Sequence, residues 1–135
     1  MTQEEKQLLL KDLSARLPYG VICFAPDYEY GDIGKLWCIE PFEDLDPQIT
    51  VQYPKGNTIT KFCSEVKPYF RPLSSMTEEE VNQYYKIRTG EDRNKPLGEL
   101  DAELFDFYNS RHLDYNELIK KELALEAPAG MYKID

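Results

Sequence analysis

The sequence contains one histidine, His112, which stands two residues before Asp114. A histidine beside a carboxylate can act as a general base with an oriented ring, or supply half of a metal site. His112 and Asp114 are therefore the candidate catalytic residues. Both also have a structural interpretation, because Asp114 fits the N-cap of a following helix and histidine is favoured at the C-terminus of a preceding one. We expect the structural roles, since no nucleophile or second ligand stands at a diagnostic spacing.

Three cysteines, Cys23, Cys38 and Cys63, could provide a nucleophile for His112. Each lies in or at the end of an apolar, β-rich segment, where a thiol usually behaves as a small hydrophobe. Their number is odd and none belongs to a C-x-x-C pair, so we expect reduced, buried thiols. One histidine and three scattered cysteines also argue against structural zinc, and we predict no bound metal.

The main candidate for binding is an acidic stretch between residues 27 and 46. It holds seven acids and one lysine, without the residue order of a calcium loop. Acids interspersed with aromatic side chains can steer a basic protein partner and then bury apolar contacts. The candidate binding residues are Asp27, Tyr28, Glu29, Tyr30, Asp32 and Phe42. The alternative is a pair of solvated loops that keep the domain soluble.

A second acidic group consists of Glu99, Asp101, Glu103 and Asp106. Carboxylates can bind magnesium for phosphoryl chemistry, but this requires convergence from several elements, and four acids on one helix usually form a solvated face. Glycine-rich phosphate-binding motifs are absent, so we predict no nucleotide or other cofactor.

Composition predicts one domain over residues 1–135, because this length fits a single core and 41% of the residues are hydrophobic. The net charge of −9 disfavours direct binding of nucleic acid. Apolar runs such as residues 8–10 are far too short to span a membrane, and the acidic N-terminus does not resemble a secretory signal. We therefore expect a cytoplasmic protein without membrane contact.

The apolar periodicity predicts an α+β fold: an N-terminal helix, a four-stranded, mainly antiparallel curled sheet or small barrel, and two to three C-terminal helices. Capping boxes and helical spacing place helices at about 3–17, 78–88 and 99–111, with a short fourth helix after Asp114. Strands are expected at 21–24, 35–39, 49–53 and 58–63. Residues 64–75, with two prolines, are expected to form a connector, and residues 89–98 a polar loop.

Three stretches together resemble a family of small uncharacterised proteins of gut Bacteroidetes and their phages and mobile elements. They are LLKDLSARLPYGV (9–21), VKPYFRPLSSMTEEE (66–80), and HLDYNELI (112–119) followed by LALEAPAGMY (123–132). The resemblance spans nearly the whole chain and is weakest between about Phe24 and Phe62. It implies a phage or mobile-element setting and no particular activity or site residue.

The sequence therefore favours a non-enzymatic protein-interaction or accessory module, with self-association as one form that the interaction could take. The first alternative is a small hydrolase or phosphoryl-transfer enzyme that uses His112, Asp114 and acids of the helix containing Asp101. The second alternative is an acidic mimic of nucleic acid.

Overall fold

The computed structural model describes residues 1–40, 47–89 and 97–132. The helices and strands in these ranges are α1 (Gln3–Arg16), β1 (Ile22–Asp27), β2 (Gly31–Glu40), β3 (Gln48–Gln52), β4 (Thr58–Phe62), β5 (Lys67–Phe70), α2 (Glu78–Thr89), α3 (Leu97–Ser110) and β6 (Leu125–Glu126). Short 3-10 turns cover Leu17–Tyr19, Cys63–Glu65 and Leu73–Ser75.

One open sheet of six strands forms the centre of the fold, in the order β4-β3-β2-β1-β5-β6. Four of its pairings are antiparallel, whereas β5 and β6 are parallel. The α+β class and the N-terminal helix are confirmed, but the prediction of four strands is wrong and the sheet does not close into a barrel. The added strands escaped prediction because β5 contains Pro68, which signals a connector, and β6 has only two residues.

The expected fourth helix is also absent, since residues 114–123 form turns. Asp114 does cap this segment, accepting hydrogen bonds from the backbone N–H groups of Leu118 at 2.8 Å and Ile119 at 3.0 Å. Glu117 and Glu122, however, have φ values of 56° and 62°, in the left-handed region that interrupts an α-helix. Of the C-terminal helices expected from the sequence, the described residues therefore form α2 and α3.

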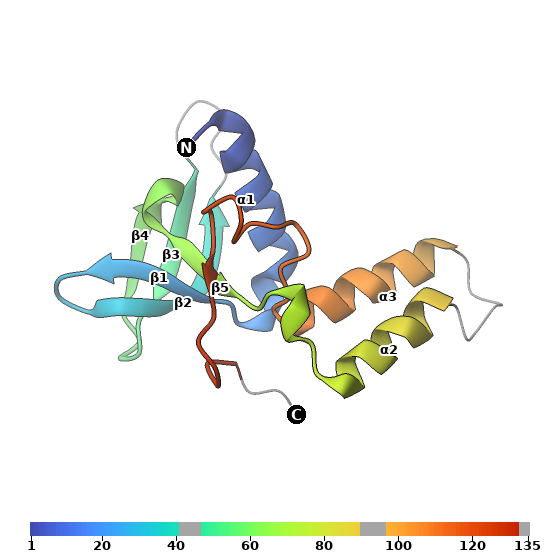
Figure 1. The fold of residues 1–135 in the computed structure, drawn as a ribbon. Helices are drawn as coiled ribbons and strands as arrows, with labels where there is room; N and C mark the ends of the chain where they lie inside the picture. The colour runs from blue at the N-terminus through green and yellow to red at the C-terminus, as the bar shows by residue number, and fades with distance from the viewer. Residues whose placement is uncertain (41–46, 90–96, 133–135) are drawn as a thin grey trace.

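Helix α1 lies against the sheet, whereas α2 and α3 lie side by side and extend away from it (Figure 1). We call α2 and α3 the helical arm. The capping box at the start of α1 is present, because Thr2 and Glu5 each accept a hydrogen bond from the backbone N–H of the other. Between α1 and the sheet lies a buried apolar core. Its largest members include Leu9, Leu13, Val21, Ile49, Val51, Tyr53, Val66, Phe70 and Leu118.

No helix in the described parts of the chain is both long and apolar enough to cross a membrane. The sheet and α1 together position the residues considered below.

Gly34 of β2 is required by the close approach of β3. A Cβ atom at this position would overlap Val51 Cγ1 and come within 2.9 Å of the Gln52 carbonyl oxygen. We expect Gly34→Ala to lower the free energy of unfolding by about 1–3 kcal/mol, the usual cost of overpacking. Urea denaturation measures this loss. The exposed neighbour Ile33 provides the control, and an equal loss for Ile33→Ala and Gly34→Ala would contradict the explanation.

Candidate functional site

His112 lies in residues 111–132, which follow α3 and which we call the C-terminal segment. Its ring stacks on Tyr132 with centroids 3.7 Å apart and planes inclined by 13°. Its Nδ1 is buried and has no hydrogen-bond partner among the described residues. Burial, assisted by the positive charges of Arg16 and Arg71, lowers the pKa of His112 to about 4. The imidazole is therefore neutral at pH 7 and packs as an aromatic ring.

His112 and Asp114 are close in sequence, but their side chains do not form a paired acid and base. The Asp114 carboxylate caps the following turns, and no hydrogen bond joins it to His112 in the described part of the chain. Their main chains instead pair with Arg71, whose N–H donates to the His112 carbonyl at 2.7 Å and whose carbonyl accepts from Asp114 N–H at 2.8 Å. A catalytic role for either residue stays a prediction that this arrangement does not favour.

The cysteines form no disulfide among the described residues; Cys23 and Cys63 are buried and Cys38 is half-buried. Burial raises the pKa of the Cys23 thiol to about 12, which makes it a poor nucleophile. No group of three or more His, Cys, Asp or Glu side chains within residues 1–40, 47–89 and 97–132 could hold a metal ion. In the acidic group of α3, Asp106 accepts a hydrogen bond from the Tyr19 hydroxyl at 3.0 Å.

A fully buried ion pair within α1 is hydrogen-bonded to the C-terminal segment. Arg16 Nε lies 2.7 Å from Asp12 Oδ1, and both side chains have an exposed fraction of 0%. Arg16 Nη2 donates to the Leu113 carbonyl at 2.6 Å, and the guanidinium lies 3.9 Å from the centre of the Phe70 ring. Asn116 Nδ2 donates to Asp12 Oδ2 at 2.7 Å. Burial raises the pKa of Asp12, and the charge of Arg16 opposes this rise.

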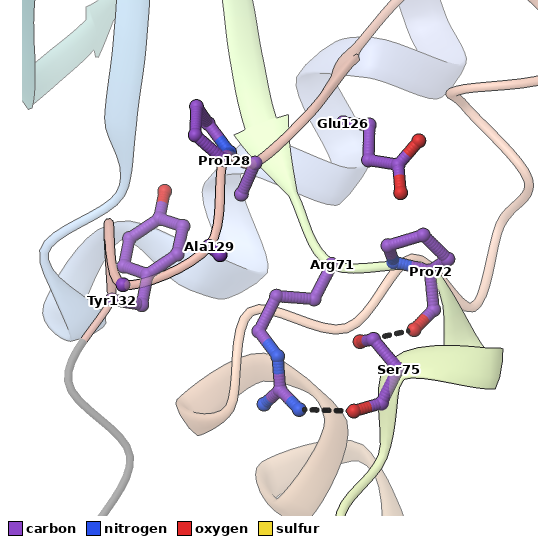
Figure 2. Close-up of a pocket in the computed structure, with 9 residues that line it drawn as sticks. Arg71, Pro72, Ser75, Glu126, Pro128, Ala129 and Tyr132 are labelled. Carbon is purple, nitrogen blue, oxygen red and sulfur yellow. Dashed lines mark hydrogen bonds between the residues drawn. The ribbon is translucent and has the colours of Figure 1, made fainter.

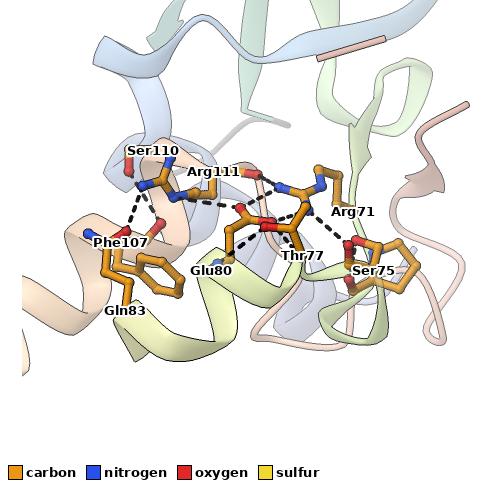
Figure 3. A network of polar contacts seen from close by, with 9 residues as sticks. Arg71, Ser75, Thr77, Glu80, Gln83, Phe107, Ser110 and Arg111 are labelled. Atoms are coloured by element: carbon orange, nitrogen blue, oxygen red, sulfur yellow. Dashed lines mark hydrogen bonds and ion pairs between the residues drawn. The ribbon is translucent and has the colours of Figure 1, made fainter. Parts of the chain in front are cut away.

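A second arginine network attaches the helical arm to the sheet. Figure 3 shows Glu80 between Arg71 and Arg111. Arg71 binds both Glu80 oxygens, at 2.9 and 2.7 Å, and also donates to the Arg111 carbonyl at 3.1 Å. Burial would raise the pKa of Glu80, but hydrogen bonds from Arg71 and Thr77 outweigh it and lower the pKa. These contacts, with a hydrogen bond to the Ser75 carbonyl at 3.1 Å, engage both Nη atoms of Arg71.

The C-terminal segment covers a cavity of about 310 Å³. Pro128, Ala129 and Tyr132 lie on one side of this cavity, with Pro72 and Ser75 on the other (Figure 2). The Tyr132 hydroxyl accepts a hydrogen bond from Ile22 N–H at 2.8 Å and donates to the Tyr69 carbonyl at 2.8 Å. Tyr132 thus ties the segment to β1 and β5, and the cavity walls offer no paired acid and base.

The predicted acidic binding residues lie mainly on the turn between β1 and β2. Tyr28 is fully exposed there, whereas Tyr30 packs on Tyr53 with ring centroids 5.9 Å apart. Asp27 accepts hydrogen bonds from Glu29 N–H at 3.1 Å and Tyr30 N–H at 3.0 Å, and therefore shapes the turn. Glu29 and Asp32 are exposed.

Phe42 lies outside the described residues. Within the described part of the predicted stretch, Tyr28, Glu29 and Asp32 present their side chains to solvent, while Asp27 and Tyr30 hold the turn in place.

An aromatic surface formed by the helical arm together with Tyr115 of the C-terminal segment was missed by the sequence analysis. Its rings contact one another in series. Centroid distances are 5.4 Å for Tyr84–Tyr85, 6.3 Å for Tyr84–Tyr108, 5.1 Å for Tyr108–Tyr115 and 5.6 Å for Tyr115–Phe105. We call these five residues the aromatic strip. Tyr85 and Phe105 at the two ends of the strip are 58% and 49% exposed, and the three rings between them are half-buried.

Part of this surface was accessible to sequence reasoning, since Phe105 and Tyr108 are three residues apart on one helix. The contact of Tyr84 with Tyr108 is long-range and depends on how α2 packs on α3. The contact of Tyr115 with Tyr108 depends on the turns that follow the end of α3 at Ser110.

Comparison of the chain with protein-family models, with curated proteins and with solved structures found no match. The resemblance to a Bacteroidetes and phage family therefore stays a prediction.

The lowered pKa of His112 predicts a pH dependence of stability. Above pH 6.5 the ring is neutral in the folded and unfolded states, so it contributes no dependence. As the pH falls from 6.5 to about 4, the unfolded state binds the proton first, and the free energy of unfolding decreases. Allowing for partial exposure, we expect a decrease on the order of 1–2 kcal/mol.

His112→Asn tolerates the positive φ and removes this contribution, while the carboxylates titrate alike in both proteins. Urea denaturation at about pH 7 and about pH 4.5 measures the difference. An equal fall in stability for wild type and variant would contradict the buried, neutral histidine.

The Asp12–Arg16 pair predicts a strong asymmetry between single and double substitutions. Arg16→Met leaves the buried Asp12 carboxylate without its cation, and we expect a loss of about 3–5 kcal/mol in the free energy of unfolding. Asp12→Asn combined with Arg16→Met removes both charges and should recover much of that loss. Urea denaturation compares the two variants. Equal losses would show that packing of the arginine stem, rather than charge, dominates.

Proposed function

We propose that the protein is a non-enzymatic interaction module that binds a basic protein partner through the aromatic strip of the helical arm. The observation that carries the proposal is the series of ring contacts that ends in exposed Tyr85 and Phe105. Tyrosine and other aromatic residues dominate binding energy at protein interfaces, because they bury large area at a small cost in side-chain entropy.

The charge of α3 supports a basic partner, while on α2 the one arginine at the strip, Arg88, is engaged by the Tyr84 hydroxyl at 2.9 Å. Helix α3 carries Glu99, Asp101, Glu103 and Asp106 and no basic residue. Asp101 precedes Phe105 by four residues and Tyr108 by seven, which places it on the same helix face as these two rings. A carboxylate beside aromatic anchors favours association with basic side chains. The net charge of −9 disfavours a second copy of this chain as the occupant.

Tyr28 supports a second candidate interface on the β1–β2 turn, because a fully exposed tyrosine next to Glu29 meets the same compositional criteria. This turn offers one exposed ring, whereas the strip offers several rings in mutual contact. We therefore propose the strip as the principal surface. The hydrolase alternative and the nucleic-acid mimic stay predictions, because neither is needed to explain these two surfaces.

The proposal is tested with two matched substitutions of exposed tyrosines. A partner is first captured by affinity purification from the native cell, then purified, and its binding is measured by surface plasmon resonance. We expect Tyr85→Ser to raise the dissociation constant at least tenfold, mainly through faster dissociation, as for a hot-spot residue. Tyr28→Ser should change it less than about twofold.

A larger effect of Tyr28→Ser than of Tyr85→Ser on the dissociation constant would assign binding to the β1–β2 turn and contradict the proposal. Unchanged binding in both variants would rule out both surfaces as the interface. Thermal unfolding of each variant checks that the fold is retained.

A further inference from the structure

We infer that the free edge of β4 pairs with β4 of a second copy of this chain, so that two sheets join into one across a two-fold axis. β4 (Thr58–Phe62) is the last strand at one end of the sheet, and no described strand lies on its outer side. Figure 1 shows β4 on the side of the sheet away from α2 and α3, so pairing there leaves the helical arm of each copy accessible. The inference does not depend on the aromatic strip.

The register of β3 and β4 shows which backbone groups of β4 point outward. Facing residues of an antiparallel ladder alternate between hydrogen-bonded and non-hydrogen-bonded pairs. Tyr53 N–H donates to the Asn57 carbonyl at 2.8 Å, and Cys63 N–H donates to the Pro47 carbonyl at 2.9 Å. Both are hydrogen-bonded pairs, one at each end of β4. The alternation between them directs away from β3 the N–H and C=O groups of Thr58, Thr60 and Phe62.

These outward groups are largely unpaired in the described parts of the chain. Phe62 N–H donates to Glu65 Oε2 at 3.3 Å, whereas the backbone groups of Thr58 and Thr60 make no hydrogen bond with other described residues. A strand edge with free donors and acceptors is a template for a further strand. The chemistry of this edge therefore requires an extended backbone as its occupant.

A second copy fits this edge better than a flexible peptide does. β4 has five residues and can form only a few hydrogen bonds with an added strand. A flexible peptide loses backbone entropy at every residue that it orders, and this loss opposes so short a contact. A second β4 is already extended and held in place by its own β3, so it does not bear this loss.

The two-fold register is centred on Thr60. In this register the Thr60 residues of the two copies exchange both backbone hydrogen bonds, and each Thr58 N–H donates to the Phe62 carbonyl of the other copy. The Phe62 ring, which is 47% exposed, then faces Thr58 of the other copy, and aromatic and β-branched side chains form stabilising cross-strand pairs. Centring on Lys61 would place two lysines directly opposite each other, and centring on Ile59 would leave Phe62 beyond the end of the other strand.

The charges near β4 permit this pairing. An inward-pointing charge on an edge strand discourages an added strand when the pairing would bury it without a partner. Lys61 Nζ, however, lies 3.9 Å from Asp27 Oδ1, and the two side chains are 14% and 12% exposed. β4 itself carries no acid. The repulsion between two chains of net charge −9 therefore arises mainly from more distant groups, and salt screens it.

Sedimentation equilibrium of the full chain, from micromolar to millimolar concentration, measures the dissociation constant of the dimer. We expect a weak dimer, because the contact is small, and tighter association at higher salt, because screening reduces the repulsion. A wild-type protein that stays monomeric over the whole range would overturn the inference. Weaker association at higher salt would contradict the charge argument and with it the assignment to β4.

Thr60→Pro tests the edge directly, because it removes the outward N–H without removing a hydrogen bond to β3. We expect the dissociation constant to rise at least about tenfold, since both symmetric bonds at the axis are lost. Thr60→Val is the matched control: it keeps the N–H and, like the proline variant, loses the contact of the Thr60 hydroxyl with the Thr50 hydroxyl at 2.8 Å. Equal dissociation constants for Thr60→Pro and Thr60→Val would contradict the inference. Circular dichroism checks that each variant folds.

A second pair of variants keeps the test decisive if Thr60→Pro does not fold. Thr60→Glu and Thr60→Lys each place like charges opposite one another at the axis, and each alone should dimerise about threefold more weakly or worse than wild type. An equimolar mixture should form heterodimers with recovered affinity, because opposite charges then face each other. Failure of the mixture to recover affinity would overturn the register.

Amide hydrogen exchange locates the contact. Exchange at Thr58 and Thr60 should slow as the protein concentration rises, while exchange at Tyr85 and Phe105 stays unchanged. The opposite pattern would place the contact on the aromatic strip and overturn the inference. Tyr85→Ser should leave dimerisation unchanged, so failure of this inference is distinguishable from failure of the proposed interface with a basic partner.

Discussion

The buried guanidinium of Arg16 is the interaction on which the rest of the fold depends. A charge with no solvent exposure is tolerated only where several partners surround it, and here those partners come from distant parts of the chain. Asp12 belongs to the same helix, the Phe70 ring comes from β5, and the carbonyl of Leu113 follows α3. The first helix, the sheet and the C-terminal segment must therefore all be in place before the charge is compensated, which couples their folding.

A second arginine–carboxylate network, adjacent to that of Arg16, attaches the helical arm to the rest of the protein. Arg71 forms a parallel bridge with Leu113, the residue whose carbonyl also accepts from Arg16. The bidentate contact of Arg71 with Glu80 fixes the start of α2, because Glu80 also accepts the Thr77 N–H in the capping box. The arm is consequently held at its base by a directional ion pair rather than by a large apolar core, and its outer surface is left available for other contacts.

The sequence predicted the elements whose signals are local and failed where long-range contacts decide the structure. Capping boxes placed the starts of α1 and α2, since a cap involves residues three positions apart. The strand β5 was missed because Pro68 and Pro72 locally indicate a connector. Its pairing with β1 and β6, which defines the strand, is not visible in the local sequence. The segment after Asp114 was assigned to a helix because its apolar spacing is helical, but two residues there adopt left-handed φ values. Likewise, His112 and Asp114 suggested catalysis by proximity, whereas their backbones pair with Arg71 and their side chains serve packing and capping.

The way in which the buried polar groups are occupied is consistent with the proposed binding role. A catalytic site needs polar groups that remain available to a substrate, and the buried charged groups of this protein are largely occupied by one another. Glu80 is bound by Arg71, and Asp114 by two backbone N–H groups. The exposed rings of the aromatic strip, by contrast, are available for contact, with Tyr85 58% and Phe105 49% exposed. Such rings supply contact area, which supports recognition of a partner without activation of a bond.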